Sequence, residues 1–262
     1  MNRNRSPFVI TAAILVALGA LVTYFSGYYV DWLWFQSVDF TDVWTTVLAT
    51  KIQLFLIVGI VTSLIISLNI YIAYKRRPLY VPVSIEVSGL ERLRAQIEPI
   101  RTWVFVGVVA ALTYFAGSSG MVFWREWLLF RNATDFGVTD PQFGLDISFF
   151  AFKLPMYQAL IGWGISTIVL AIIAAAAVHY IYGGIRTQVK EDRTTVAARV
   201  QLSILLGLLV LLKAVAYWFD RYALTLKEGR LITGLTYSDV NALLPAKSIL
   251  AAIAVICSLL FF

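Results

Sequence analysis

The sequence predicts an all-α protein, a polytopic bundle of transmembrane helices, and three observations predict this class. Apolar residues make up 60% of the 262 residues and charged residues only 14%, whereas a soluble domain has roughly half and a quarter. The mean hydropathy is +0.80. Six apolar runs of helical length are separated by more polar segments. Together these observations argue against a water-soluble enzyme.

Each apolar run can be compared with the roughly 20 residues that a helix needs to cross a hydrocarbon core of about 30 Å. The first run, Phe8–Val30, follows Arg3 and Arg5. It is too long for the apolar part of a signal peptide and ends in aromatic residues, so we expect it to be retained. The expected spans cover residues 8–30, 52–74, 102–124, 156–182, 200–219 and 248–262.

The sixth run is still apolar where the sequence stops at Phe262. Its roughly 15 residues rise only about 22 Å, which is too short to cross a bilayer. We therefore expect this sequence to be the N-terminal transmembrane domain of a longer protein.

The distribution of basic residues predicts the orientation, because cytoplasmic loops carry an excess of Lys and Arg. With the N-terminus inside, the inner segments hold twelve cations and five acids, and the outer segments hold eight cations and ten acids. The formal net charge of +6 is then explained by segments that face anionic lipid headgroups. The lipid bilayer is the expected partner, and no nucleic acid is needed.

The inner segment between the second and third spans contains a capping-box pattern, Ser88-Gly89-Leu90-Glu91. Leu90, Leu93, Ile97 and Ile100 then recur at helical spacing. This pattern predicts a short amphipathic helix on the cytoplasmic membrane surface. We interpret it as a structural linker in preference to a partner-binding helix.

Tryptophan is concentrated at the expected outer ends of the spans. Such a belt anchors helices at the level of the headgroups and implies no ligand. The excess of tryptophans on one side of the membrane indicates a substantial structure on that face, such as an extracytoplasmic domain. The six outer tryptophans are Trp32, Trp34, Trp44, Trp124, Trp127 and Trp218.

A search for catalytic chemistry finds one tempting motif, Gly117-Ser118-Ser119-Gly120, which resembles the GxSG of rhomboid intramembrane proteases. The base would have to be His179, the single histidine. Ser119 and His179 are expected near opposite membrane surfaces, whereas a nucleophile and its base need hydrogen-bond reach. The two glycines are better explained by close helix packing. We therefore predict that the protein is not an enzyme.

Metal and cofactor sites are also not indicated. One Cys and one His exclude an internal disulfide, a cysteine-based metal site and a histidine cluster. His179, next to Tyr180, is expected in the inner interfacial belt with a structural role. No cofactor is expected.

Lys213 is the one formal charge inside an expected span. Intramembrane charges are functional candidates by default. Lys213 is, however, only about 10 Å along the helix from Asp220, near enough to the outer interface for its side chain to reach water. An anchor is the favoured reading, followed by a structural ion pair and then by an ion pathway.

Two outer loops carry longer motifs. Residues 140–155 read DPQFGLDISFFAFKLP and residues 234–247 read GLTYSDVNALLPAK. Together with Asp31-Trp32-Leu33-Trp34-Phe35, they resemble uncharacterised protein family 0182, whose patterns are close to DPxFGxDIxFYxFxLP and GxxYTDVNAxLPA. Phe150 stands in place of the usual Tyr, and Ser238 in place of the usual Thr.

The resemblance implies a large bacterial multi-pass protein of the plasma membrane, of the type common in actinobacteria. It also implies that the chain continues through a further helix into a large extracytoplasmic region. It supplies no function and no catalytic residues.

The motif residues can still be read physically. The family-motif residues of unknown role are Asp140, Pro141, Phe143, Gly144, Asp146, Tyr237, Asp239, Asn241 and Pro245. Aspartate and asparagine side chains can cap turns, and Pro141 restricts the backbone of the residue before it. Docking of the loops onto the bundle explains these residues without a ligand. Binding of a cation or an envelope glycolipid is the alternative for the polar ones.

Two functions remain open from the sequence. The first is a membrane platform that holds an extracytoplasmic domain in cell-envelope maintenance, with envelope lipids or extracytoplasmic proteins as partners. The second is a transporter or channel, including one for lipids. A transporter should have broken helices or polar groups at mid-membrane, and the spans contain few.

Overall fold

The computed structural model describes residues 7–78, 95–186, 193–228 and 233–262. The all-α class predicted from the sequence is confirmed, because six of the described helices are long and apolar enough to cross a membrane. Within the described ranges, extended pairing is limited to three isolated antiparallel bridges. The chain divides into two compact units, residues 1–52 and 53–262.

The long helices extend beyond several of the ranges expected from hydropathy. They are α1 (Pro7–Ser37), α2 (Thr41–Lys75), α4 (Arg101–Gly120), α6 (Leu154–Ile181), α7 (Val196–Ala223) and α8 (Leu244–Leu259), with the short α5 (Trp124–Arg131) between α4 and α6. Most of the amphipathic segment expected from Ser88 to Ile100 lies outside the described residues. Its end, from Ala95 onward, is helical and closes in a 3₁₀ turn, η1 (Glu98–Ile100).

The first unit consists of α1 and the start of α2. The apolar side chains of α1 are exposed along most of its length, as shown by Phe8 and Val16, which are 79% and 73% exposed. Such exposure suits a helix whose surroundings are lipid. The chain turns between the two helices at Asp39, whose φ of 59° lies in the left-handed region, which Asp tolerates better than most residues.

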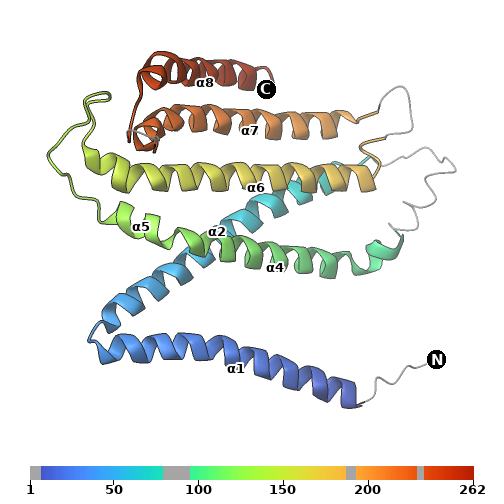
Figure 1. Cartoon of the computed structure of the whole chain (residues 1–262). Coiled ribbons are helices and arrows are strands. Elements are labelled where there is room, and N and C mark those ends of the chain that lie inside the picture. The colour runs from blue at the N-terminus through green and yellow to red at the C-terminus, as the bar shows by residue number, and fades with distance from the viewer. Residues whose placement is uncertain (1–6, 79–94, 187–192, 229–232) are drawn as a thin grey trace. The chain divides into compact units, whose positions relative to one another are not determined.

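In the second unit, α6, α7 and α8 lie side by side (Figure 1). Small residues permit this packing, since Ala171 and Ala175 of α6 are fully buried against Leu205 of α7. Between α7 and α8, Ser258 donates a 3.0 Å hydrogen bond to the carbonyl oxygen of Gly207. Such contacts between small residues are the usual way in which apolar helices associate inside a membrane.

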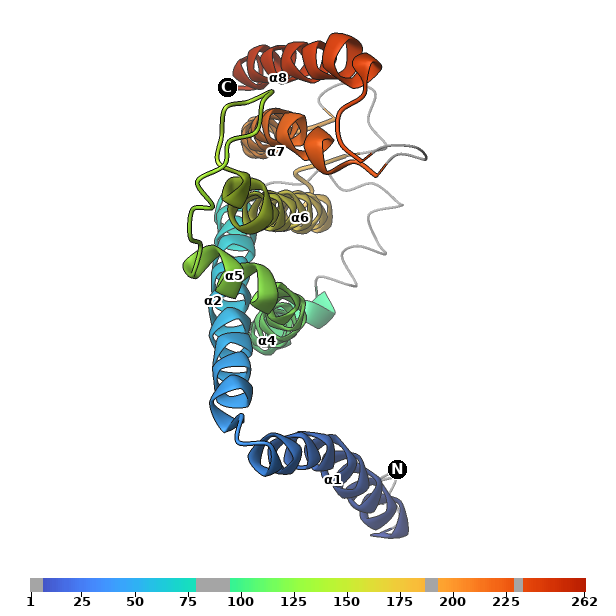
Figure 2. The same cartoon turned by 60° about the vertical axis from the view of Figure 1, so that its left-hand side comes forward.

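The part of α2 from Gln53 onward runs obliquely past α4 toward α6 (Figure 1 and Figure 2) and contacts one helix after another. It meets α4 first, where a Cβ on Gly59 would lie 2.6 Å from the Thr113 carbonyl oxygen. Trp163 of α6 then donates a 2.8 Å hydrogen bond to Thr62. Further along, the Asn69 carbonyl of α2 accepts a 2.9 Å bond from Gln201 of α7. These contacts make α2 a strut across the unit.

Helices α6 and α8 begin in the same way, with a π-helical turn followed by Leu-Pro. The turns are η3 (Phe149–Lys153) and η5 (Asp239–Leu243). In each, the leucine amide bonds to the carbonyl five residues before it, from Leu154 to Phe149 and from Leu244 to Asp239. The following proline has no N–H, and its ring would clash with the carbonyl four residues earlier, so a wider turn is accommodated there.

The second unit has two distinct ends. We call the end formed by the C-termini of α5 and α7 and the N-termini of α6 and α8 the motif end, because residues 132–148 and 233–243 lie there. The opposite end, the basic end, holds an aromatic and arginine cluster. There the Arg77 guanidinium lies 4.0 Å from the Tyr74 ring and 5.2 Å from the Tyr182 ring, and Arg101 donates to the Tyr74 hydroxyl at 2.7 Å.

Candidate functional site

The first motif loop is organised around the carboxylate of Asp146. It accepts hydrogen bonds from the amides of Gly137 at 2.8 Å, Ser148 at 2.8 Å and Phe136 at 3.1 Å. Hydrogen bonds from Ser148, through its side chain and then its amide, and from Phe136 and Gly137 lower the pKa of Asp146 from 3.8 to about 2. Asp146 therefore ties the start of the loop, before Val138, to its end.

Asp140 closes a tight turn within the same loop. Its carboxylate accepts from the amides of Phe143 at 2.7 Å and Gln142 at 3.0 Å, which is the Asx-type capping expected of Asp before Pro141. Gly144 has a φ of +66° and donates its amide to the Asp140 carbonyl at 2.8 Å. This left-handed position explains the motif glycine, because a side chain there is strained.

Aromatic rings attach this loop to the end of α7. Phe143 lies 4.9 Å from Tyr222, and Phe149 lies 5.4 Å from the same ring. Tyr157 and Phe219 extend the cluster with a centroid distance of 5.1 Å. Aromatic pairs at these distances add stabilisation beyond their buried area, so the apolar residues of the first motif dock the loop onto the bundle.

The second motif is organised around Asp239, which is fully buried. One carboxylate oxygen accepts from the Lys227 ammonium group at 2.8 Å. The other accepts from the Thr236 hydroxyl at 2.6 Å and from the Thr236 amide at 2.9 Å. A buried carboxylate needs this degree of pairing to remain charged, and neither oxygen is left free for a ligand.

The other residues of the second motif have simpler surroundings. Asn241 is exposed and donates a 2.9 Å hydrogen bond to the Tyr237 carbonyl. The Tyr237 side chain is 86% exposed. Pro245 follows the π-helical turn in the first turn of α8. Nearby, Lys247 of α8 bonds to Asp220 of α7 at 3.1 Å, so both motifs are joined to the end of α7.

The structure thus assigns the motif carboxylates to turn formation and docking. Among the described residues, no group of three His, Cys, Asp or Glu side chains is placed to hold a metal ion. The carboxylates of Asp146 and Asp239 accept hydrogen bonds from neighbouring donors. The cation or glycolipid site considered for Asp140, Asp146, Asp239 and Asn241 stays a prediction.

A family model confirms the origin of these motifs. The model described as Uncharacterised protein family (UPF0182) matches residues 8–262. The chain belongs to this family.

UPF0182 relatives from actinobacteria match the whole chain. A UPF0182 protein of Streptomyces coelicolor is 45% identical over 100% of this chain and 27% of its own length. One of Nocardioides is 47% identical over 99% of this chain and 26% of its own length. One of Thermobifida fusca is 42% identical over 100% of this chain and 26% of its own length. The chain therefore spans about a quarter of the length of these relatives. No solved structure matches it.

Lys213, the intramembrane charge of this UPF0182 chain, is exposed on α7. Its ammonium group lies 5.3 Å from the centre of the Tyr217 ring, one helical turn nearer the motif end. Within the described ranges it makes no salt bridge. A cation over an aromatic ring on an exposed helix face fits the anchor interpretation better than the buried ion pair.

His179, in the last turn of α6, is buried among the helices, with 1% of its surface exposed. Its Nε2 lies 3.0 Å from the Gln201 Oε1 of α7, and Gln201 in turn donates to Asn69 of α2. This polar network is the buried feature that sequence reasoning missed. The available signal was that three uncharged polar residues interrupt three different apolar runs.

The Gly117-Ser118-Ser119-Gly120 segment packs α4 against α2, as expected for its glycines. A Cβ on Gly117 would lie 2.7 Å from the Phe55 carbonyl oxygen, and one on Gly120 would lie 2.6 Å from the Val58 Cβ. Ser119 is in the last turn of α4, at the motif end, whereas His179 is in the last turn of α6, at the basic end. The two side chains are not brought together.

Proposed function

We propose that this chain is a membrane-embedded platform that holds and positions an extracytoplasmic domain of the bacterial envelope. The observation that carries the proposal is the construction of the motif end. Both motif loops are fixed to the end of α7, the first by the Phe143 and Phe149 contacts with Tyr222 and the second by the Lys247–Asp220 ion pair, while the buried Asp239 closes the second loop onto Lys227. A rigid surface of this kind suits the support of another domain.

The surface also offers contacts for such a domain. Tyr237 is 86% exposed, and Val138 and Phe136 of the first loop are 55% and 51% exposed. Exposed apolar side chains next to a fixed, hydrogen-bonded scaffold are typical of protein contact sites. The relatives are about four times as long as this chain, which supports a further part of the protein as the supported domain. The proposed role is non-enzymatic.

Cysteine labelling tests the orientation on which the proposal depends. In a Cys257→Ser background, which removes the single cysteine of these 262 residues, Tyr237→Cys should react with a membrane-impermeant maleimide in intact cells. Arg76→Cys, at the basic end, is the matched control and should react only after the cells are opened. Labelling of Arg76→Cys in intact cells, with Tyr237→Cys protected, would refute an outward-facing motif end.

A second experiment tests the platform role in the full-length protein. Spin labels at Tyr237→Cys and on the downstream domain should give one narrow distance distribution. Asp239→Ala removes the buried anchor of the second loop and should broaden it, whereas Lys213→Gln should leave it unchanged. A distribution that is equally broad in all three proteins would contradict the platform.

A transporter or channel, including one for lipids, is the second candidate. One observation favours it, namely the buried chain from His179 through Gln201 to Asn69, since polar groups inside spans often mark transport paths. Flux measurements on proteoliposomes decide between the two. Flux that is lost in Gln201→Leu but kept in Lys213→Gln would favour transport over the platform.

A further inference from the structure

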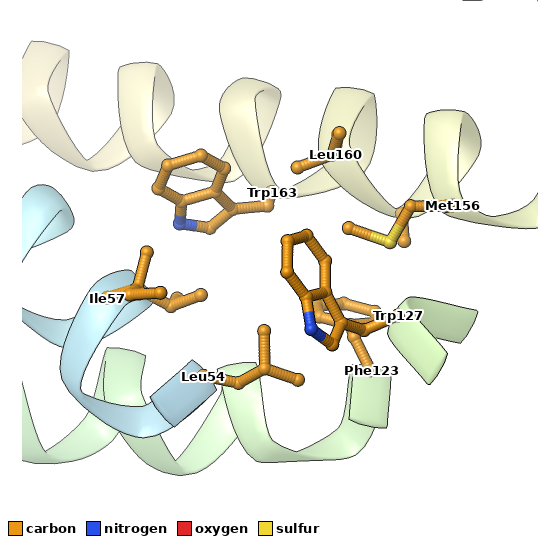
Figure 3. Close-up of a pocket in the computed structure, with 9 residues that line it drawn as sticks. Leu54, Ile57, Phe123, Trp127, Met156, Leu160 and Trp163 are labelled. Carbon is orange, nitrogen blue, oxygen red and sulfur yellow. The ribbon is translucent and has the colours of Figure 1, made fainter. Parts of the chain in front are cut away.

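An apolar pocket lies between α2, α5 and α6, near the motif end (Figure 3). Its volume is about 90 Å³, and every residue that lines it is apolar. Trp127 and Trp163 contribute the largest side chains. The indole nitrogen of Trp163 is already bonded to Thr62 at 2.8 Å. A buried water needs two to four polar partners, so this pocket favours a hydrocarbon occupant.

The pocket has a closed floor and an open side. Leu54, Val58 and Met156 are only 5%, 8% and 4% exposed and form the floor, whereas Ile57 and Leu160 are 53% and 44% exposed. The open side is therefore at Ile57 and Leu160, both on helices long and apolar enough to cross a membrane. An occupant can enter from the lipid without passing a polar barrier.

Two cations lie one helical turn from the pocket, toward the motif end. Arg131 is four residues after Trp127 on α5, and Lys153 is three residues before Met156 at the start of α6, which are the spacings of side chains that share a helix face. The elements that carry them, α5 and η3, pack against one another. Among the described residues, neither cation makes a salt bridge.

We propose that this pocket binds a few methylene groups near the glycerol of one acyl chain of an anionic phospholipid, whose phosphate is held by Arg131 and Lys153. The apolar walls select the chain and the cations select the headgroup. The lipid comes from the leaflet at the motif end, whichever side of the membrane that end faces. The site is therefore independent of the platform role proposed above.

A photoreactive lipid tests the site directly. The full chain is reconstituted in phosphatidylcholine nanodiscs containing a few per cent of phosphatidylglycerol that carries a diazirine on one acyl chain, close to the glycerol. After irradiation, cross-linked peptides are mapped by mass spectrometry. Adducts should concentrate on residues 123–127 and 156–163 and exceed those on α8, which is also apolar and exposed. Equal labelling of all exposed apolar helices would overturn the proposal.

Filling the pocket should abolish this selective labelling. Ala159→Phe places a ring in the pocket, because Ala159 lines it. The matched control is Ala177→Phe on the exposed face of the same helix, which should label like the unchanged protein. Should Ala159→Phe fail to fold, the headgroup variants described next carry the test alone. Undiminished pocket labelling in a folded Ala159→Phe protein would contradict the site.

The headgroup contacts are tested with surface substitutions that leave the pocket intact. Arg131→Gln and Lys153→Gln should each weaken pocket labelling about fivefold, the factor expected for one cation near an anionic lipid surface. Arg125→Gln, on a different face of α5, is the control and should change nothing. Equal labelling by a phosphatidylcholine analogue with the same diazirine would show that no anionic headgroup is recognised and would refute the cation contacts.

Discussion

The contact between α4 and α2 leads to a quantitative prediction about Gly117. A Cβ at this position would lie 2.7 Å from the Phe55 carbonyl oxygen and 2.8 Å from the Phe55 ring, whereas ordinary contacts begin at 3.4 Å. The backbone atom cannot rotate away, so Gly117→Ala must push the two helices apart by roughly 0.7 Å. A gap of this size forfeits a quarter to a half of the dispersion energy of the contacts it opens.

We expect Gly117→Ala to lower the free energy of unfolding by about 1–3 kcal/mol, the usual cost of overpacking. Gly107→Ala is the matched control, because it lies on the same helix and its Cβ would meet nothing within 4 Å. That change should raise stability by about 0.5–1 kcal/mol, since glycine is a poor helix former. The two substitutions are chemically identical, so their difference isolates the helix contact.

The assay is reversible unfolding in mixed micelles, followed by tryptophan fluorescence as the fraction of denaturing detergent rises. Gly117→Ala should unfold at a lower detergent fraction than the unchanged protein, and Gly107→Ala at the same or a higher one. If Gly117→Ala were as stable as Gly107→Ala, the close approach of α4 to α2 would not be a feature of the folded protein, and the packing argument for this segment would fail.

Three further predictions concern single polar groups. The pKa of Asp146 is lowered to about 2, so the ionised carboxylate stabilises the loop fully above about pH 4, and this stabilisation is lost as the pH falls through about 2. Pepsin cleavage of residues 132–148 should therefore increase as the pH falls over that range. Asp146→Asn should remove this pH dependence. Gln201→Leu leaves the buried His179 Nε2 without its partner and should cost about 1–3 kcal/mol in micelle unfolding. Lys213→Gln removes only an exposed cation–π contact with Tyr217 and should change the same unfolding curve by less than about 1 kcal/mol; a larger loss would indicate a buried ion pair.

Part of the candidate site could be anticipated from local sequence. Gly144 is in a turn because its neighbours Asp140 and Pro141 specify one, and its positive φ needs only that turn. Docking of the motif loops, including Phe143, was also among the expectations, and the structure adds Phe149. Their common partner, Tyr222, lies more than seventy residues away in the chain, and no local pattern identifies such a pair.

The two motif aspartates show where local reasoning ends. Asp146 and Asp239 look alike in the sequence, yet Asp239 is fully buried beside Lys227 and Asp146 is partly exposed among backbone amides. Burial of such a residue depends on which helix ends pack around it, and that packing is a property of the assembled bundle. His179 illustrates the same limit, because only the positions of Gln201 and Asn69 on two other helices decide that it is buried.

The sequence by itself determined the all-α class and the positions of the long apolar helices, because helix formation and hydrophobic length are properties of continuous runs of residues. Only the tertiary structure decided how those helices meet. The oblique course of α2, the apolar pocket beside Trp163 and the pairing of each polar side chain depend on crossing positions. These are set by the shapes of surfaces far apart in the chain, where small residues permit approach and large ones prevent it.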